Sequence, residues 1–140
     1  MIVTIDDKEQ INELVKYAIH TYPDLHVIAR AVDRNHTYDL WAYGCRDIIR
    51  ESYDSSLRIG RSAFEALGAS KAAAEALKDE FNALDRRAMI EVAGAYDVSI
   101  PAHENDAYIA KVREVIAEWE PGLRERMAEI LTSESYLERD

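Results

Sequence analysis

The hydrophobic pattern of this chain changes at residue 52, and that change limits what the chain can fold into. Before it, short apolar runs at residues 1–5, 25–31 and 46–51 alternate with segments at 6–22 and 34–44 that contain apolar residues at helical spacing. Alternating strands and helices with short connections give parallel strands joined by right-handed crossovers. The first part of the chain therefore predicts three parallel strands with crossover helices, which is half of a doubly wound sheet.

After residue 52 the apolar spacing is helical. A stripe at intervals of 4, 3, 4 and 3 predicts a helix over 52–68, formed by Tyr53, Leu57, Gly60, Phe64 and Leu67. A second helix is expected over 70–96 and a loop over 97–106. One or two acidic amphipathic helices should follow, divided at Pro121 and Gly122.

The predicted fold is α/β: a truncated Rossmann-like half followed by an all-α helical extension. We expect three parts, with the sheet over 1–51, a helical arm over 52–96 and an acidic helical tail over 97–140. Gly60 on the apolar stripe suggests that another element approaches the helix backbone closely. The first strand would expose an edge where the sheet ought to continue. The chain is therefore expected to begin inside a larger fold and to form oligomers.

Charge and composition exclude several classes of protein. The chain has 17 basic and 27 acidic residues and a formal net charge of −10, which disfavours binding along a nucleic-acid backbone. It has no apolar run of about 18 residues, so no segment is expected to insert into a membrane. It contains no GxGxxG phosphate loop, and its four histidines and single cysteine have no metal-binding spacing. We therefore expect no metal site and no complete nucleotide pocket within this chain.

Polar residues gather where the carboxyl ends of the predicted strands meet. Asp33 follows the second strand, His36 lies in the first turn of the next helix, and Arg50 ends the third strand. Ligands of doubly wound sheets bind outside the carboxyl ends of the strands. Asp33 and His36 are therefore candidates to line a polar site, with Arg50 on the same rim. The alternative is that Asp33 only caps the following helix.

Three arginines, Arg50, Arg58 and Arg61, lie within twelve residues of one another. A guanidinium can bind a carboxylate or phosphate through two hydrogen bonds, so this cluster suggests recognition of a small anion. The alternative is a set of salt bridges with neighbouring carboxylates such as Glu65. Exposed pairs of that kind stabilise a protein by only about 0–1 kcal/mol each.

Two stretches of the sequence resemble a known family. Residues 2–51, from "IVTIDD" to "DIIRE", look like the second half of a TrkA-N (RCK) Rossmann domain. The stretch "RESYDSSLRIGRSAFEALG" and the later "LDRR" are similar to the segment that follows this domain in Kef-type potassium/proton antiporters. The order and spacing of these motifs carry the resemblance, which covers residues 2–95.

The resemblance implies a cytoplasmic, non-catalytic regulatory part of an antiporter in the bacterial inner membrane, joined to a membrane domain. In the family an adenine nucleotide binds at a glycine-rich loop, which this chain lacks. Some members bind glutathione near the dimer interface, through residues that match Asp33, Arg50 and Asp85. Arg50 suits a glutathione carboxylate. Asp85 departs from the glutathione-gated members, which have an amide there, and its carboxylate would repel an anion.

In the family the helix after the last strand packs against the partner subunit of a homodimer. The resemblance therefore places five residues of this chain at a dimer interface: Tyr53, Leu57, Gly60, Arg61 and Phe64. Two other functions remain open from the residues alone. One is a structural oligomerisation module. The other is a fragment of a nucleotide-dependent oxidoreductase, which the missing glycine-rich loop and the lack of an evident acid–base pair disfavour.

Overall fold

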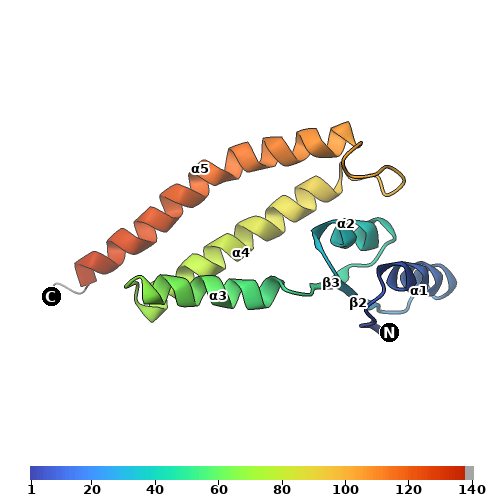
Figure 1. Cartoon of the computed structure of the whole chain (residues 1–140), viewed down its shortest axis with the longest axis horizontal. Helices are drawn as coiled ribbons and strands as arrows, with labels where there is room; N and C mark the ends of the chain where they lie inside the picture. Colours follow the sequence, from blue (N-terminus) through green and yellow to red (C-terminus); the bar gives the residue numbers. More distant parts are fainter. Residues whose placement is uncertain (138–140) are drawn as a thin grey trace. The chain divides into compact units, whose positions relative to one another are not determined.

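A computed structural model describes residues 1–137 of the chain, and Figure 1 shows their helices and strands. The contacts divide the described chain into two compact units. We call the first the sheet unit, which contains Met1–Tyr53 and Ala93–Ile109. The second, the helical unit, contains Asp54–Val92 and the described chain from Ala110 onward. The predicted division of the chain into three parts by role stays a prediction.

Three parallel strands form the sheet, in the order β1 (Ile2–Val3), β2 (Ile28–Ala31), β3 (Asp47–Arg50). Helix α1 (Lys8–Thr21) joins β1 to β2, and α2 (Arg34–Ala42) joins β2 to β3. Both crossovers advance in the same direction across the sheet, so right-handed connections put both helices on one face. The predicted α/β class, three parallel strands with crossover helices and then a helical extension, is confirmed.

The core of the sheet unit lies between the sheet and its two helices. Side chains alternate between the two faces of a strand, so Ala29 and Ala31 point to the helices and are fully buried. The other buried members of this cluster come from the strands, the helices and the loops: Val3, Ile11, Val15, Ala18, Val27, Leu40 and Cys45. The opposite face of the sheet carries Ile2 and Ile49, which are 70% and 51% exposed.

The strands are shorter than the apolar runs that predict them. β1 ends at Val3 and β2 begins at Ile28. Leu25, the first residue of the apolar run over 25–31, is 40% exposed. The reason is local, because the Leu25 N–H donates to the Tyr22 carbonyl at 2.9 Å in the turn after α1. The chain therefore enters β2 three residues later than the pattern indicates.

The helical unit consists of parts of three helices: α3 (Tyr53–Ala66), α4 (Lys71–Ala93) and α5 (Asp106–Leu137). The first residue of α3, the last residue of α4 and the first turn of α5 belong to the sheet unit. Gly68 has φ +102° between α3 and α4, a left-handed conformation that commonly ends helices. Ser70 caps α4, because its hydroxyl accepts the N–H of Ala73 in the first turn at 3.2 Å.

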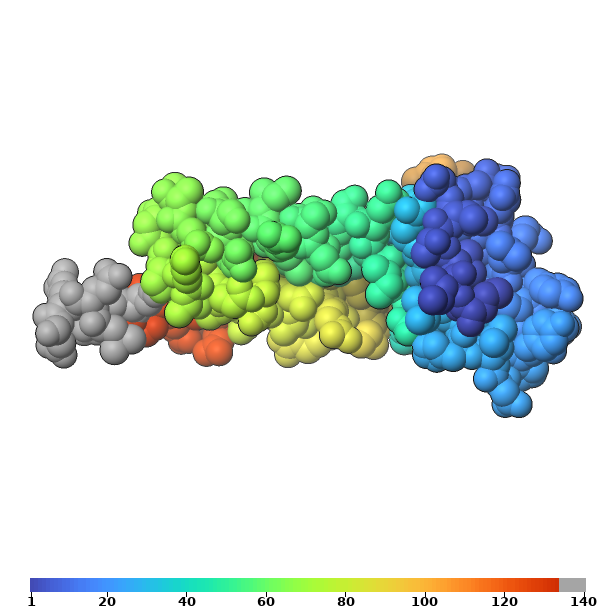
Figure 2. Space-filling view, turned by 90° about the horizontal axis from the view of Figure 1, so that it is seen from below, coloured from blue at the N-terminus to red at the C-terminus, as the bar shows by residue number. Residues whose placement is uncertain are grey.

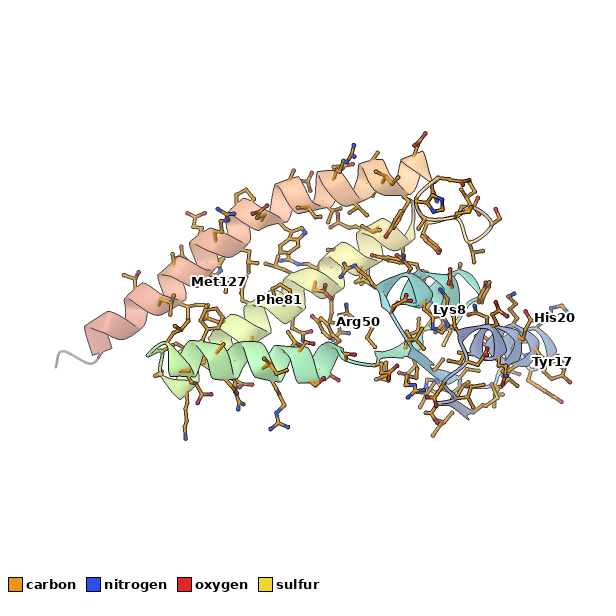
Figure 3. The ribbon with its side chains drawn as sticks, in the orientation of Figure 1. Lys8, Tyr17, His20, Arg50, Phe81 and Met127 are labelled. Carbon is orange, nitrogen blue, oxygen red and sulfur yellow. The ribbon has the colours of Figure 1, made fainter. Side chains whose placement is uncertain are left out.

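Helix α4 packs against both of the other helices. Arg61 of α3 pairs with Glu75 of α4 at 3.2 Å. Phe81 of α4, labelled in Figure 3, meets the ring of Trp119 on α5 edge-on, with the two ring centroids 6.3 Å apart. The buried apolar residues of this unit lie on α4 and α5: Ala73, Ala74, Leu77, Ala88, Val92, Val115 and Leu123.

Of the one or two helices expected in the tail, the structure has one, and Pro121 and Gly122 do not divide it. Helix α5 continues through both residues. A proline inside a helix removes a backbone hydrogen bond and costs about 3 kcal/mol, and a glycine costs about 1 kcal/mol. Val115 and Leu123 are buried on either side of the proline, at 4% and 8% exposure. Packing on both sides therefore holds α5 together across the two unfavourable residues.

Candidate ligand site at the carboxyl edge of the sheet

The carboxyl ends of the strands meet at one edge of the sheet. Ala31 of β2 pairs with Arg50 of β3, and the Glu51 N–H donates to the Ala31 carbonyl at 3.0 Å. Asp33 lies just beyond Ala31, where the chain turns into α2. Neighbouring strands therefore bring Asp33 and Arg50 to the same edge, which is where parallel α/β sheets bind their ligands.

Arg30 ties the strand ends together at this edge. Its guanidinium donates to the Ile5 carbonyl at 2.9 Å and to the Asp6 carboxylate, both just beyond β1. It also lies 4.0 Å from the Glu51 carboxylate beyond β3. Sequence reasoning missed Arg30, although a single arginine inside the apolar run "LHVIARA" was a signal for it. Charge-assisted hydrogen bonds of this kind fix the turns on which a ligand site would be built.

Asp33 caps α2, which is the alternative to a role in lining a polar site. Its Oδ1 accepts the His36 N–H at 2.7 Å, and the backbone of Asp33 is extended, as is usual at an N-cap. Asp33 is an exposed residue. Its role in binding a ligand stays a prediction.

His36 lies inside the sheet unit with its side chain fully buried. Its Nδ1 accepts the Val32 N–H at 3.0 Å, so the ring proton is on Nε2, which donates to Asn12 Oδ1 at 3.0 Å. Burial lowers the pKa of His36, and the charge of Lys8 lowers it further. Both ring nitrogens are therefore engaged, and the neutral imidazole fixes the turn from β2 into α2. The ring does not reach the exposed surface on which Asp33 lies.

Arg50 stacks on the ring of Tyr53, with its Cζ atom 3.3 Å from the ring centroid. Figure 3 shows Arg50 at the point where β3 gives way to α3. A cation over an aromatic face is held electrostatically, and the guanidinium fork has the geometry to bind a planar carboxylate or a phosphate. Stacking on Tyr53 therefore gives the candidate anion-binding group a defined orientation.

Asp85 belongs to the helical unit, where it lies on α4 and is 5% exposed. The two residues that follow it, Arg86 and Arg87, are exposed. The structure thus places Asp33 and Arg50 at the carboxyl edge of the sheet unit, buries the ring of His36 inside that unit, and places Asp85 in the helical unit.

The residues expected at a dimer interface lie along α3 and are all partly exposed: Tyr53, Leu57, Gly60, Arg61 and Phe64. Arg61 pairs with Glu65 and with Glu75, each at 3.2 Å, so for this arginine the salt-bridge alternative is the one observed. Figure 2 shows that the outer surface of α3 is not covered by other helices of the chain.

Gly60 does not bring another described element close to α3, contrary to the expectation from its place on the stripe. A Cβ atom built at Gly60 meets no heavy atom of another element within 4 Å. The glycine therefore has no packing reason within the described chain, although it costs about 1 kcal/mol relative to alanine in a helix.

Other kinds of site find no support in the described residues. No group of three or more His, Cys, Asp or Glu side chains among residues 1–137 could hold a metal ion. None of the helices in this part of the chain is long and apolar enough to cross a membrane. Cys45 is buried, and burial raises the pKa of its thiol, so it is a poor nucleophile. The carboxyl edge of the sheet remains the candidate site.

Comparison with known proteins identifies the helical part of the chain. Residues 55–135 match the family described as the potassium efflux system KefB C-terminal domain. The chain belongs to this family. It is also 33% identical, with a TM-score of 0.66, to a solved structure, the Kef CTD of Shewanella denitrificans in AMP-bound form. The similarity covers 69% of this chain and 61% of the Shewanella protein.

These findings confirm the resemblance to the C-terminal regulatory part of a Kef-type antiporter. The family match begins at residue 55, next to the start of the helical unit at Asp54. It therefore rests on α3, α4 and α5, whereas the candidate site lies in the sheet unit. The solved Kef structure supplies a comparison of fold over 69% of this chain.

The state of His36 predicts a pH dependence of stability. Its pKa is lowered in the folded chain from the usual value of about 6.5, so the unfolded chain binds the proton more readily. The contribution of the neutral ring is complete above about pH 6.5 and is lost as the pH falls through the lower, folded-state pKa. We expect the melting temperature to fall between pH 6.5 and pH 5, and to fall less in His36→Gln.

The control is His20→Gln, because His20 is exposed on α1, as Figure 3 shows. Thermal melts at half-unit pH steps measure the effect. The assignment of a neutral His36 would be contradicted if His36→Gln and the wild type lost stability in parallel below pH 6.5. It would also be contradicted if His20→Gln, and not His36→Gln, removed the pH dependence.

Proposed function

We propose that this chain is a ligand-sensing regulatory part of a potassium/proton antiporter, with no catalysis of its own. The observation that supports this most is membership of the KefB C-terminal domain family over residues 55–135. The sheet with an open carboxyl edge provides a place for the ligand. In this proposal the chain is joined to a membrane antiporter domain and lies on the cytoplasmic side of a bacterial inner membrane.

The ligand we propose is a small organic anion that binds through a phosphate or carboxylate group, and AMP and glutathione are the probes for it. The similar Shewanella structure is an AMP-bound form, and the resemblance to glutathione-gated members points to the positions of Asp33, Arg50 and Asp85. Arg50 is the residue that would bind a phosphate or carboxylate group. Asp33 would hold the ligand through its exposed carboxylate, accepting a hydrogen bond from it. Asp85, a carboxylate in place of an amide, would weaken glutathione binding.

A ligand gates a transporter only through a difference in its affinity for the two states of the protein. The regulatory chain must therefore change its own structure, or its association with a second copy, when the anion binds. The proposed carboxyl-edge site suits this role because three strand ends and the starts of both crossover helices meet there.

The role of Arg50 can be tested by isothermal titration calorimetry with AMP and with glutathione. Arg50→Ala should weaken binding by about tenfold or more, because a hydrogen bond to a charged group is typically worth about 1.5–3 kcal/mol. Arg58→Ala is the matched control, since Arg58 is an exposed arginine on the following helix.

The site assignment fails if Arg50→Ala binds both compounds as the wild type does, or if Arg58→Ala loses as much affinity. Binding of neither compound to the wild type would contradict ligand sensing by this chain. If stable oligomers persisted in that case, a structural oligomerisation module would be the better description.

We further propose that the chain self-associates through α3. The support is that the predicted interface residues are all partly exposed and that Gly60 faces open space. A glycine that costs helix stability and meets nothing within its own chain is explained by the backbone of a second copy approaching at that point.

The substitution Gly60→Ala should change helix stability and self-association in opposite directions. We expect a higher melting temperature, since alanine stabilises a helix interior by about 1 kcal/mol relative to glycine. We expect weaker self-association, since the added methyl group occupies the space used by the second copy. Differential scanning fluorimetry and sedimentation equilibrium measure the two quantities.

Gly122→Ala is the matched control, because a Cβ atom at this helical glycine also meets open space. It should raise the melting temperature and leave the association constant unchanged. Wild-type association in Gly60→Ala, together with the gain in stability, would contradict an interface at Gly60.

A further inference from the structure

A buried carboxylate joins two segments of the sheet unit that are far apart in sequence. Asp39 on α2 is 7% exposed, and both of its oxygens are engaged. Lys8, at the start of α1, lies 3.0 Å from Oδ2, and the hydroxyl of Tyr96 donates to Oδ1 at 2.6 Å. Burial and the neighbouring Asp39 raise the pKa of Tyr96, so its hydroxyl stays protonated as a donor. A carboxylate this buried depends on such partners.

Three tyrosines extend this contact. Tyr38 of α2, Tyr96 and Tyr108 form a closed triangle, with ring centroids 5.3 to 5.7 Å apart. The hydroxyl of Tyr108 also donates to Asn35 Oδ1 at 3.2 Å. Asn35 and Asp39 are four residues apart and so lie on one face of α2. That face therefore holds both Tyr96 and Tyr108.

The segment held by α2 connects the two long helices of the chain. Residues 93–109 begin where α4 ends and include the first turn of α5. Asn105, which is 4% exposed, accepts the Tyr108 N–H at 3.0 Å and so caps α5. Helix α2 is therefore bonded at two points to the segment that joins the end of α4 to the start of α5.

The same contacts adjoin the carboxyl edge. Lys8 begins α1 just after the turn that leaves β1, and Figure 3 labels it there. Asn35 lies in the first turn of α2, which Asp33 caps. A ligand that contacts Asp33 or the turn after β1 therefore lies next to Asn35, which accepts the Tyr108 hydroxyl, or next to Lys8, which pairs with Asp39.

We infer that Asp39, Tyr96 and Tyr108 form a latch that couples the first turn of α2 to residues 93–109, and so to α4 and α5. The coupling to ligand rests on the proposed anion site. In this proposal the latch opens as a unit, because the rings of Tyr96 and Tyr108 pack on each other and on Tyr38. Release of Tyr96 leaves the buried Asp39 carboxylate with Lys8 alone, so water must enter and residues 93–109 come away together. A ligand that binds the open or the closed state better shifts the balance between them.

Hydrogen–deuterium exchange in this chain tests the latch, with AMP and glutathione as the probes. In the wild type, saturating probe should change the exchange rates of amides in residues 94–109. Tyr96→Phe removes one hydroxyl and keeps the ring. It should raise ligand-free exchange in this segment about tenfold, since a hydrogen bond to a charged group is lost. It should bind the probe within about twofold of the wild type, because it leaves Asp33 and Arg50 intact, and its exchange should no longer respond.

Tyr17→Phe is the matched control, because Tyr17 is a 61% exposed tyrosine on α1 that loses the same atom. Tyr108→Phe, which loses only the bond to Asn35, is the second variant if Tyr96→Phe does not fold. The inference is overturned if the probe binds and exchange in residues 94–109 does not respond in the wild type. It is also overturned if the response persists unchanged in the tyrosine variant.

An exchange experiment without ligand tests this inference independently of the proposed function. Asp33→Ala removes the cap of α2. Introduced alone, it should speed amide exchange in residues 94–109. Added to Tyr96→Phe, it should change exchange in these residues little further. If neither probe binds the wild type, the proposed ligand site fails, and this experiment alone decides the latch. Unchanged exchange in residues 94–109 of Asp33→Ala would then overturn it.

Discussion

The sheet unit depends on the burial of one carboxylate. Asp39 is placed among apolar and aromatic side chains, and an ionised carboxylate there is stable only with its partners in position. Those partners come from the first residue of α1 and from a tyrosine 57 positions further along the chain. The start of α1, the middle of α2 and residues 93–109 must therefore assemble together. This explains why the sheet unit contains residues 93–109 in addition to residues 1–53.

The architecture of the sheet unit could be predicted from local pattern, and its tertiary contacts could not. Alternating apolar runs and helical spacing depend on residues a few positions apart, so the three parallel strands and their crossover helices follow from the sequence, as does the cap at Asp33 as one of two alternatives. The partners of Asp39 are set by the return of a distant segment, which no local pattern contains. His36 illustrates the same limit: its spacing placed it beside a polar rim, and packing turned its ring into the core.

The errors elsewhere have the same origin. Pro121 and Gly122 are correctly read as unfavourable for a helix, yet burial of Val115 and Leu123 on either side outweighs their cost. Gly60 is correctly read as unusual on an apolar stripe, and the element expected against it is absent from the described chain. Arg30 joins the ends of the strands through carbonyl and carboxylate groups that only the folded edge brings together.

The proposed function assigns ligand binding to the sheet unit. The family match covers most of the helical unit and residues 93–109 of the sheet unit, and the edge at which an anion would bind lies outside it, in the sheet unit. The most direct test of that edge is a backbone-amide NMR titration of the chain with AMP and with glutathione. We expect the largest shifts at residues 5–8, 32–36 and 50–53, the turns that surround the strand ends. Shifts confined to α4 and α5, or none at all at saturating ligand, would contradict a ligand site at the carboxyl edge.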